Sequence, residues 1–421
     1  MFASSSRFLL RTLALTSLLI YGSGASQPAW AEESSVPPPL PAYATTMAPR
    51  VQPLMEQMLI PGAVVAVRSP ECGDWTAAFG YRDLARTQPI TVEDHFRIGS
   101  NTKTMTGTVV LQLVDEGKVH LEDPISDYVD GVPNGEKITL DLLLRMRSGL
   151  TNYTQDLSLN EQLDTNRFRI WTPSELLALA FAGPEAVPNS EYEYCNTNTV
   201  LLGKVIEKVL QQPAEEAVTE RIFQRLGLAH TLLPLAGNNS IPNPHPRGYM
   251  FSTNVATIES SRLSPSDLAA AFAGTLLPSD QTESSPSWTW TAGSGISTVE
   301  DLAVYARALG RGQLISDKLQ QARLASLTPI DPSKPDGSKY GWGMAKLGPM
   351  LGHTGSLPGF NSFMGHDPER DLTVIVLTNL NSTPQGQPPA VKLAVEIMAE
   401  LYGKQMGPRP LLGPHPDAEQ K

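Results

Sequence analysis

The stretch FRIGSNTKTMTGTVVLQLVDEG, residues 96–117, decides the fold of this chain. Apolar residues recur in it at helical spacing, which predicts a helix with one buried face that ends at Gly117. The residues of that face are Met105, Val109, Leu113 and Val114. Ser100 stands at the N-terminal end of the predicted helix, where free backbone N–H groups favour negative charge.

Ser100 and Lys103 are spaced i, i+3, so on a helix they share one face. A serine hydroxyl needs a neighbouring base to become a nucleophile, and a lysine whose pKa is depressed by burial or charge can supply it. The alternative is a purely structural pair, in which the serine caps the helix and the lysine is solvated. The apolar and small residues on both sides of the pair favour packed surroundings, so we predict Ser100 as nucleophile and Lys103 as its base.

A second motif is Tyr194-Cys195-Asn196, in a predicted loop over 189–198 before a helix that starts at Thr199. The phenol can relay a proton, and the amide can bind a substrate carbonyl or hold the lysine. The alternative is a surface tyrosine followed by an asparagine that caps the next helix.

A third motif is His353-Thr354-Gly355-Ser356, where a strand is expected along the edge of a cleft. Small residues would let a substrate lie against this strand, and the N–H of Ser356 would form an oxyanion hole with that of Ser100. A glycine-rich turn between strands is the alternative.

Strand patterns occur near both ends of the chain, at 62–67, 75–81, 341–343, 352–355 and 372–377. The middle is helical in pattern, and a last helix is expected over 390–402. This order predicts an α/β fold with an all-α part: a sheet domain from residues 46–134 and 286–405, with a helical insert domain over 135–285. Residues 406–421 form a proline-rich tail that we expect to be disordered.

The first residues carry two arginines, a short apolar run and Ala29-Trp30-Ala31. This pattern predicts a cleaved signal peptide over 1–31, and residues 32–45 read as a flexible leader. We therefore expect a periplasmic or secreted protein without stable membrane insertion. The sequence leaves the oligomeric state open.

The net charge of −11 disfavours nucleic acid as a partner. The histidines show no zinc-site spacing, so a metal site is not expected. The two cysteines, Cys72 and Cys195, are expected to be buried free thiols, with a bridge between them as the alternative.

Taken together and in this order, the three motifs resemble those of the penicillin-recognising serine hydrolases, which include class C β-lactamases and D-alanyl-D-alanine carboxypeptidases. Ser100-x-x-Lys103 looks like their first motif, Tyr194-Cys195-Asn196 like the Y-x-N form of the second, and His353-Thr354-Gly355 like an H-T-G form of the third. Further similar segments extend the resemblance over roughly residues 50–400.

The resemblance implies a β-lactamase/transpeptidase-like fold, an antiparallel sheet flanked by helices with a helical insert. It also implies an acyl-enzyme at Ser100, proton transfer shared by Lys103 and Tyr194, and substrate binding by Asn196, His353, Thr354, Gly355 and Ser356. No cofactor is implied, and the implied substrate is a small peptide, ester or β-lactam.

One departure concerns Ala345-Lys346, where some carboxypeptidase relatives have an arginine that binds the substrate carboxylate. A lysine lacks the two-pronged geometry of arginine. The leading expectation is a D-alanyl-D-alanine carboxypeptidase-like peptidase. A β-lactamase, a short-chain esterase and a penicillin-binding sensor without turnover are the alternatives.

Overall fold

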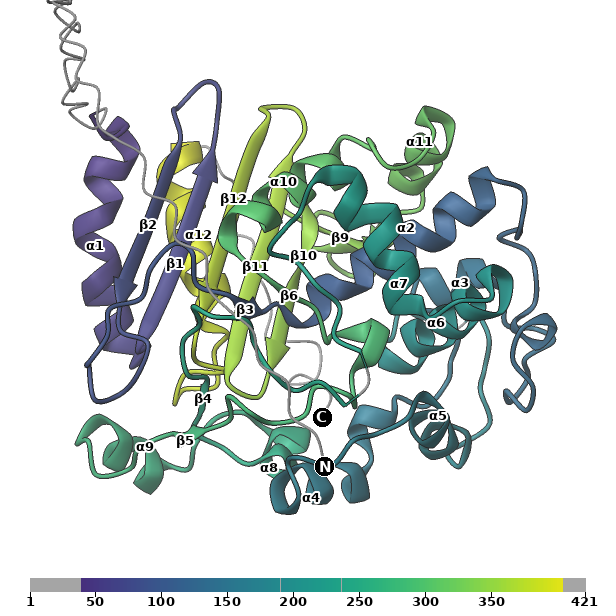
Figure 1. Cartoon of the computed structure of the whole chain (residues 1–421), viewed down its shortest axis with the longest axis horizontal. Coiled ribbons are helices and arrows are strands. Elements are labelled where there is room, and N and C mark those ends of the chain that lie inside the picture. Colours follow the sequence, from purple (N-terminus) through teal and green to yellow (C-terminus); the bar gives the residue numbers. More distant parts are fainter. Residues whose placement is uncertain (1–38, 190, 236, 404–421) are drawn as a thin grey trace, which may run out of the picture. The chain divides into compact units, whose positions relative to one another are not determined.

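An eight-stranded antiparallel sheet organises the part of the chain that the computed structural model describes, residues 39–403 apart from 190 and 236 (Figure 1). The predicted signal peptide over 1–31 and the predicted tail over 406–421 lie outside the described residues. In spatial order the strands are β2 (Trp75–Gly80), β1 (Gly62–Arg68), β12 (Leu372–Thr378), β11 (Phe360–Asp367), β10 (Met350–Leu357), β9 (Met344–Leu347), β8 (Lys339–Gly341) and β7 (Thr328–Pro329).

The central strands of this sheet are buried on both faces, as β1 illustrates. Val64 and Ala66 belong to one hydrophobic core, whereas Ala63, Val65 and Val67 belong to the other. Because successive side chains of a strand point to opposite faces, an unbroken apolar run is what a sheet between two layers requires. The sequence therefore reads as a continuous apolar strand instead of an alternating one.

Helices cover both faces of the sheet. Helices α1 (Ala42–Met58) and α12 (Pro389–Tyr402) pack together on one face, and α10 (Val299–Gly310) packs on the other (Figure 1). The remaining helices are α2 (Thr102–Asp115), α3 (Leu140–Leu144), α4 (Leu157–Thr165), α5 (Pro173–Phe181), α6 (Asn196–Leu210), α7 (Ala214–Val218), α8 (Asn254–Glu259), α9 (Pro265–Phe272) and α11 (Asp317–Ala325). Two short strand pairs join β3 (Phe96–Arg97) to β6 (Ile296–Ser297) and β4 (Tyr249–Met250) to β5 (Ser279–Asp280).

The predicted fold class is confirmed, since an antiparallel sheet with flanking helices carries a helical middle segment. The predicted strands at 62–67, 75–81, 352–355 and 372–377 and the helix over 390–402 correspond to β1, β2, β10, β12 and α12. The prediction at 341–343 is wrong for its last two residues, because they form the turn after β8. Strand β11 was not predicted, because FNSFMGHD contains no β-branched residue.

The predicted flexible leader over 32–45 ends too late, because α1 already begins at Ala42. One face of α1 is buried, formed by Tyr43, Ala44, Met47, Val51 and Met55. Pro49 and Pro53 lie inside this helix and conceal its pattern in the sequence. Packing against the sheet and α12 stabilises the helix in spite of the two prolines.

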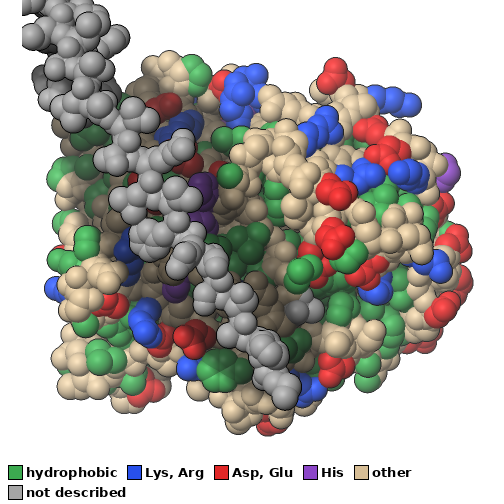
Figure 2. All heavy atoms as spheres, viewed as in Figure 1, with side chains coloured by type: hydrophobic (Ala, Val, Ile, Leu, Met, Phe, Trp, Pro, Cys, Tyr) green, Lys and Arg blue, Asp and Glu red, His purple; other side chains and the backbone are tan. Residues whose placement is uncertain are grey.

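The two cysteines are free thiols: Cys195 is buried, as predicted, but Cys72 is only partly so. None of the helices within residues 39–403 is long and apolar enough to cross a membrane. On the face seen in Figure 2, acidic and basic side chains are interspersed over the helical part.

Candidate active site

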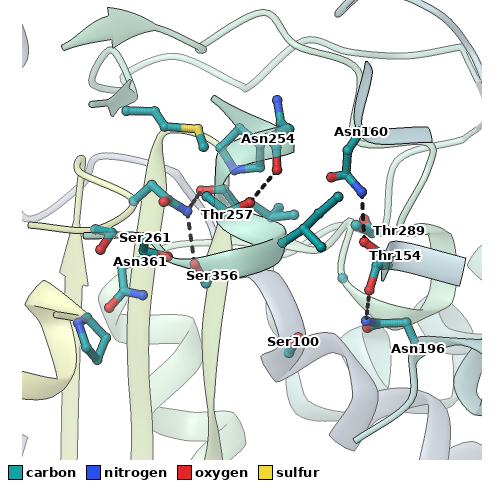
Figure 3. Close-up of a pocket in the computed structure, with 18 of the residues that line it drawn as sticks. Ser100, Thr154, Asn160, Asn196, Asn254, Thr257, Ser261, Thr289, Ser356 and Asn361 are labelled. Carbon is teal, nitrogen blue, oxygen red and sulfur yellow. Dashed lines mark hydrogen bonds between the residues drawn. The ribbon is translucent and has the colours of Figure 1, made fainter. Parts of the chain in front are cut away.

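A cleft of about 180 Å³ opens beside Ser100, between β10 and the helical segment of the chain (Figure 3). Four of the predicted site residues line it: Ser100, Tyr194, Asn196 and Ser356. In Figure 3, Ser100 lies between Ser356 on the strand side and Asn196 on the helical side. The tertiary fold thus joins three segments that are far apart in the sequence.

Ser100 lies in a short 3₁₀ turn, η1 (Gly99–Asn101), which runs directly into α2. Lys103 lies in the first turn of α2, and its Nζ is 3.0 Å from the Ser100 Oγ. The i, i+3 spacing therefore produces the hydrogen bond that the sequence predicted. Lys103 itself is only 1% exposed, so its amine meets Ser100 in a water-poor environment.

Two further acceptors hold the Lys103 amine. Its Nζ donates to the Asn196 Oδ1 at 2.6 Å and to the Ala292 carbonyl oxygen at 2.7 Å. Ala292 ends a second 3₁₀ turn, η5 (Trp290–Ala292), which no sequence pattern singled out. With the Ser100 Oγ, these acceptors fix the amine in three directions.

Asn196 does not lie in a loop, as the sequence suggested, but is the first residue of α6. Its Nδ2 donates to the Thr154 Oγ1 at 3.1 Å and to the Asn152 Oδ1 at 3.3 Å. These bonds orient the side-chain amide so that its oxygen faces Lys103. The helix starts earlier than predicted because Thr197 and Asn198 do not form a polar loop. Both are buried, and their side chains donate to the carbonyl oxygens of Thr151 and Leu143.

Tyr194 lies at the rim of the cleft, immediately before α6. Its ring centroid is 4.9 Å from the Lys103 Nζ. The next residue, Cys195, is buried, and burial raises the pKa of its thiol to about 11. Its Sγ donates to the Leu150 carbonyl oxygen at 3.3 Å, so this thiol is a packing residue. Tyr194, in contrast, lines the cleft.

Strand β10 passes very close to the turn that carries Ser100. A Cβ at Gly355 would lie 2.0 Å from the Ile98 carbonyl oxygen, and a Cβ at Gly99 would lie 2.6 Å from the Ser356 backbone nitrogen. Gly99 also has a φ of +54°, in the left-handed region that favours glycine. Only glycine at both positions permits this approach, which brings the Ser356 backbone beside Ser100.

The structure places His353 outside the lining of the cleft. It is 5% exposed, and its Nδ1 lies 2.6 Å from the Thr354 carbonyl oxygen. Its ring packs beside those of Tyr194, at 6.1 Å between centroids, and Tyr340, at 5.7 Å. Thr354 and Gly355 also lie outside the lining residues, so substrate contact by these three residues stays a prediction.

The rest of the lining comes from residues that the sequence analysis did not single out. They include Thr154, Asn160, Asn254, Thr257, Trp288 and Asn381. These are scattered polar and aromatic residues with no motif spacing, so no signal in one sequence would have found them.

Among the residues that the structure describes, none that lines the cleft is Asp, Glu, Lys, Arg or His. Lys103 does not line the cleft and reaches it through its hydrogen bond to Ser100. Lys346, the second residue of the Ala345-Lys346 departure, is exposed on β9 and does not line the cleft. Within residues 39–403, no three His, Cys, Asp or Glu side chains gather as metal ligands would.

Comparison with known proteins identifies the family of the chain. A family model described as beta-lactamase matches residues 47–397. Protein flp of Staphylococcus aureus is 24% identical over 77% of this chain and 60% of that protein, so the chain spans about 60% of the length of this curated relative. The putative penicillin-binding protein PbpX of Bacillus subtilis is 28% identical over 43% of each chain.

Solved structures give the same result. A D-stereospecific amidohydrolase from Streptomyces sp. is 30% identical, with a TM-score of 0.70, and the match covers 84% of this chain and 98% of that one. The octameric penicillin-binding protein homologue from Pyrococcus abyssi is 25% identical, with a TM-score of 0.70 over 87% of this chain and 79% of that one. The chain therefore belongs to the beta-lactamase family of penicillin-recognising serine hydrolases.

Proposed function

We propose that this protein hydrolyses small amides or esters through an acyl-enzyme at Ser100, with Lys103 and Tyr194 sharing the proton transfers. The observation that carries the proposal is the hydrogen bond between the Lys103 Nζ and the Ser100 Oγ at the floor of an open cleft. A buried amine at this distance is placed to take the hydroxyl proton as the serine attacks.

In the proposed reaction, the Ser100 Oγ forms a bond to the substrate carbonyl carbon, and its proton passes to Lys103. Backbone N–H groups of Ser100 and Ser356 would stabilise the negative charge on the carbonyl oxygen. Tyr194 would deliver a proton to the leaving amine or alcohol as the carbon–heteroatom bond breaks, and would take up in its place the proton that Lys103 received from Ser100. Water then attacks the acyl-enzyme by the reverse route and releases the acid.

For the substrate, we propose a short peptide or amide built from D-amino acids. The sequence analysis favoured a D-alanyl-D-alanine carboxypeptidase, which must bind a free carboxylate. The described residues that line the cleft supply no arginine or lysine for that group, and burial of an unpaired carboxylate is costly. The similarity to a D-stereospecific amidohydrolase supports the related reaction on an uncharged amide.

We also propose that the protein works in the periplasm or outside the cell. The support for this location is the signal-peptide pattern of residues 1–31. Detection of a mature N-terminus at Glu32 in protein from an expressing bacterium would test it.

The decisive experiment is a substrate panel with wild-type protein and the Ser100→Ala variant. A D-alanyl-D-alanine peptide, the same peptide as its C-terminal amide, p-nitrophenyl acetate and a chromogenic cephalosporin separate the four activities. We expect the wild-type protein to cleave the peptide amide faster than the free acid, and Ser100→Ala to cleave neither. Hydrolysis by Ser100→Ala at the wild-type rate would exclude Ser100 as the nucleophile.

The β-lactamase and esterase alternatives share the same acyl-enzyme and are decided by the same panel. A sensor without turnover would be labelled by a fluorescent penicillin at Ser100 and would keep the label. Following label release over time distinguishes it from an enzyme.

A further inference from the structure

The turn η5 holds the Ala292 carbonyl beside the Lys103 amine, and its first residue has a strained backbone. Trp290 has a φ of +38°, in the left-handed region that bulky residues rarely adopt. Such a conformation persists only where the surrounding structure holds it in place. The contacts of the Trp290 side chain therefore help to hold η5 in its position.

One such contact is a buried hydrogen bond to an acidic side chain that the proposed reaction does not use. The Trp290 Nε1 donates to the Glu215 Oε1 at 2.9 Å, and Glu215, on α7, is 6% exposed. Burial, with Glu207 and Glu216 adding like charge, raises the pKa of the Glu215 carboxyl. An oxygen is available to accept the indole N–H whether or not the group is protonated.

Packing surrounds most of the indole, since Trp290 is 6% exposed, but one part of it faces a cavity. On one side it lies against α6, where a Cβ at Gly203 would come within 2.7 Å of the Trp290 Cζ3. Trp290 and Glu215 also line a separate cavity of about 140 Å³, together with Trp171 and Ser294. No side chain of the described residues fills that space, so the hydrogen bond to Glu215 fixes the indole on the side that faces the cavity.

From Trp290 the connection to Lys103 is short. The next residue, Thr291, donates from its Oγ1 to the Thr199 carbonyl oxygen at 3.0 Å, and its own carbonyl accepts from the Thr106 Oγ1 at 2.8 Å. The residue after that is Ala292, whose carbonyl oxygen lies 2.7 Å from the Lys103 Nζ. A rotation of the strained Trp290 backbone would therefore displace an acceptor of the lysine amine.

We propose that Glu215 is a positioning residue for the Ser100 reaction: by holding the Trp290 indole, it fixes η5 and thereby the Ala292 carbonyl that orients Lys103. The inference rests on the proposed function, because it assigns Lys103 a part in catalysis. Glu215 contacts neither Ser100 nor the cleft and acts only through η5.

The test compares three variants of the full chain on whichever panel substrate the wild-type protein hydrolyses. Glu215→Leu removes the acceptor and keeps an apolar side chain of similar size, whereas Glu215→Gln keeps the acceptor oxygen. Glu216→Leu, at the exposed neighbour on α7, is the matched control. We expect Glu215→Leu to lower kcat at least tenfold with KM changed less than threefold, and the other two to stay within threefold of wild type.

Trp290→Phe removes the donor of the same hydrogen bond, and it tests the inference if Glu215→Leu does not fold. It should reproduce the loss of kcat in protein whose circular dichroism is unchanged. Equal kcat in wild type and in the folded variants that lack this hydrogen bond would overturn the inference, as would equal losses in Glu215→Leu and Glu215→Gln. A wild-type protein that is inert on every substrate would instead overturn the proposed function, and the inference with it.

Discussion

The Asn196 Oδ1 lies 2.6 Å from the Lys103 Nζ, although 93 residues separate the two in the chain. This contact joins the start of α6 to the first turn of α2, so it connects the two helices that carry the first two sequence motifs. The same amide is fixed from behind by Thr154 and Asn152. The side chain therefore keeps a neutral acceptor against the lysine.

Asn196→Asp should replace that neutral acceptor by a carboxylate of the same shape. An adjacent negative charge favours the protonated ammonium, which cannot accept the serine proton. We expect kcat at neutral pH to fall by about 10²-fold, the low end of what a general base contributes. Steady-state kinetics on the best panel substrate measures kcat. Gln155→Glu, at an exposed residue of the cleft lining, is the control that introduces the same charge away from Lys103. A similar loss in both variants would mean that charge in the cleft, not contact with Lys103, is responsible.

Lys103→Met should remove the proposed base while keeping a long side chain in the same buried space. Hydrolysis should fall by about 10²- to 10⁴-fold. The Asn196 and Ala292 oxygens lose a buried donor, so the free energy of unfolding should fall by about 1–3 kcal/mol. Kinetics together with urea unfolding test both effects. Lys118→Met, at an exposed lysine, should leave both unchanged, and activity retained in Lys103→Met would refute the assignment of the base.

Gly355→Ala should separate β10 from the turn that carries Ser100. The new Cβ would lie 2.0 Å from the Ile98 carbonyl oxygen and 2.4 Å from the Ser362 Oγ. We expect the free energy of unfolding to fall by about 1–3 kcal/mol, as for overpacked sites, and kcat/KM to fall by about 10²-fold through misplacement of the reacting groups. Adding Ser362→Ala should not restore activity, because the backbone clash remains. Rescue by this second substitution would show that only the hydroxyl obstructs the new methyl group.

His366 should make stability depend on pH. Burial lowers the pKa of this imidazole to about 4, below the ordinary value near 6.5 that applies when the chain is unfolded. Between these values the unfolded chain binds a proton that the folded chain does not, so stability is full above pH 6.5 and falls as the pH falls toward 4. The slope is about 1.4 kcal/mol per pH unit.

The measurement is urea unfolding from pH 7 to pH 4 for wild type and His366→Phe. As the pH falls through this window, the unfolding free energy of wild type should fall by up to about 3 kcal/mol relative to that of the variant. His120→Gln, at a largely exposed histidine, should follow the wild-type curve. Parallel curves for wild type and His366→Phe would show that His366 titrates normally.

The sequence alone predicted the parts of this protein that follow from short-range patterns. The i, i+3 spacing of Ser100 and Lys103 produces their contact within one turn, because η1 runs directly into α2 and both side chains leave the same face of this continuous stretch. Continuous apolar runs predicted β1 and β12, since a strand between two layers must be apolar on both sides. Helix α1 was not recognised, because tertiary packing stabilises it despite its two prolines.

Only the tertiary structure decided which groups surround Ser100 and Lys103. Asn196 and the Ala292 carbonyl meet Lys103 because α6 and η5 pack against α2, and no local pattern encodes a contact between residues more than 90 positions apart. His353, grouped with the substrate-binding residues in the sequence, is buried beside the rings of Tyr194 and Tyr340, and Tyr340 comes from β8, two strands away in the sheet. The uncharged lining of the cleft is likewise a property of the fold, because it is assembled from single residues on many separate segments.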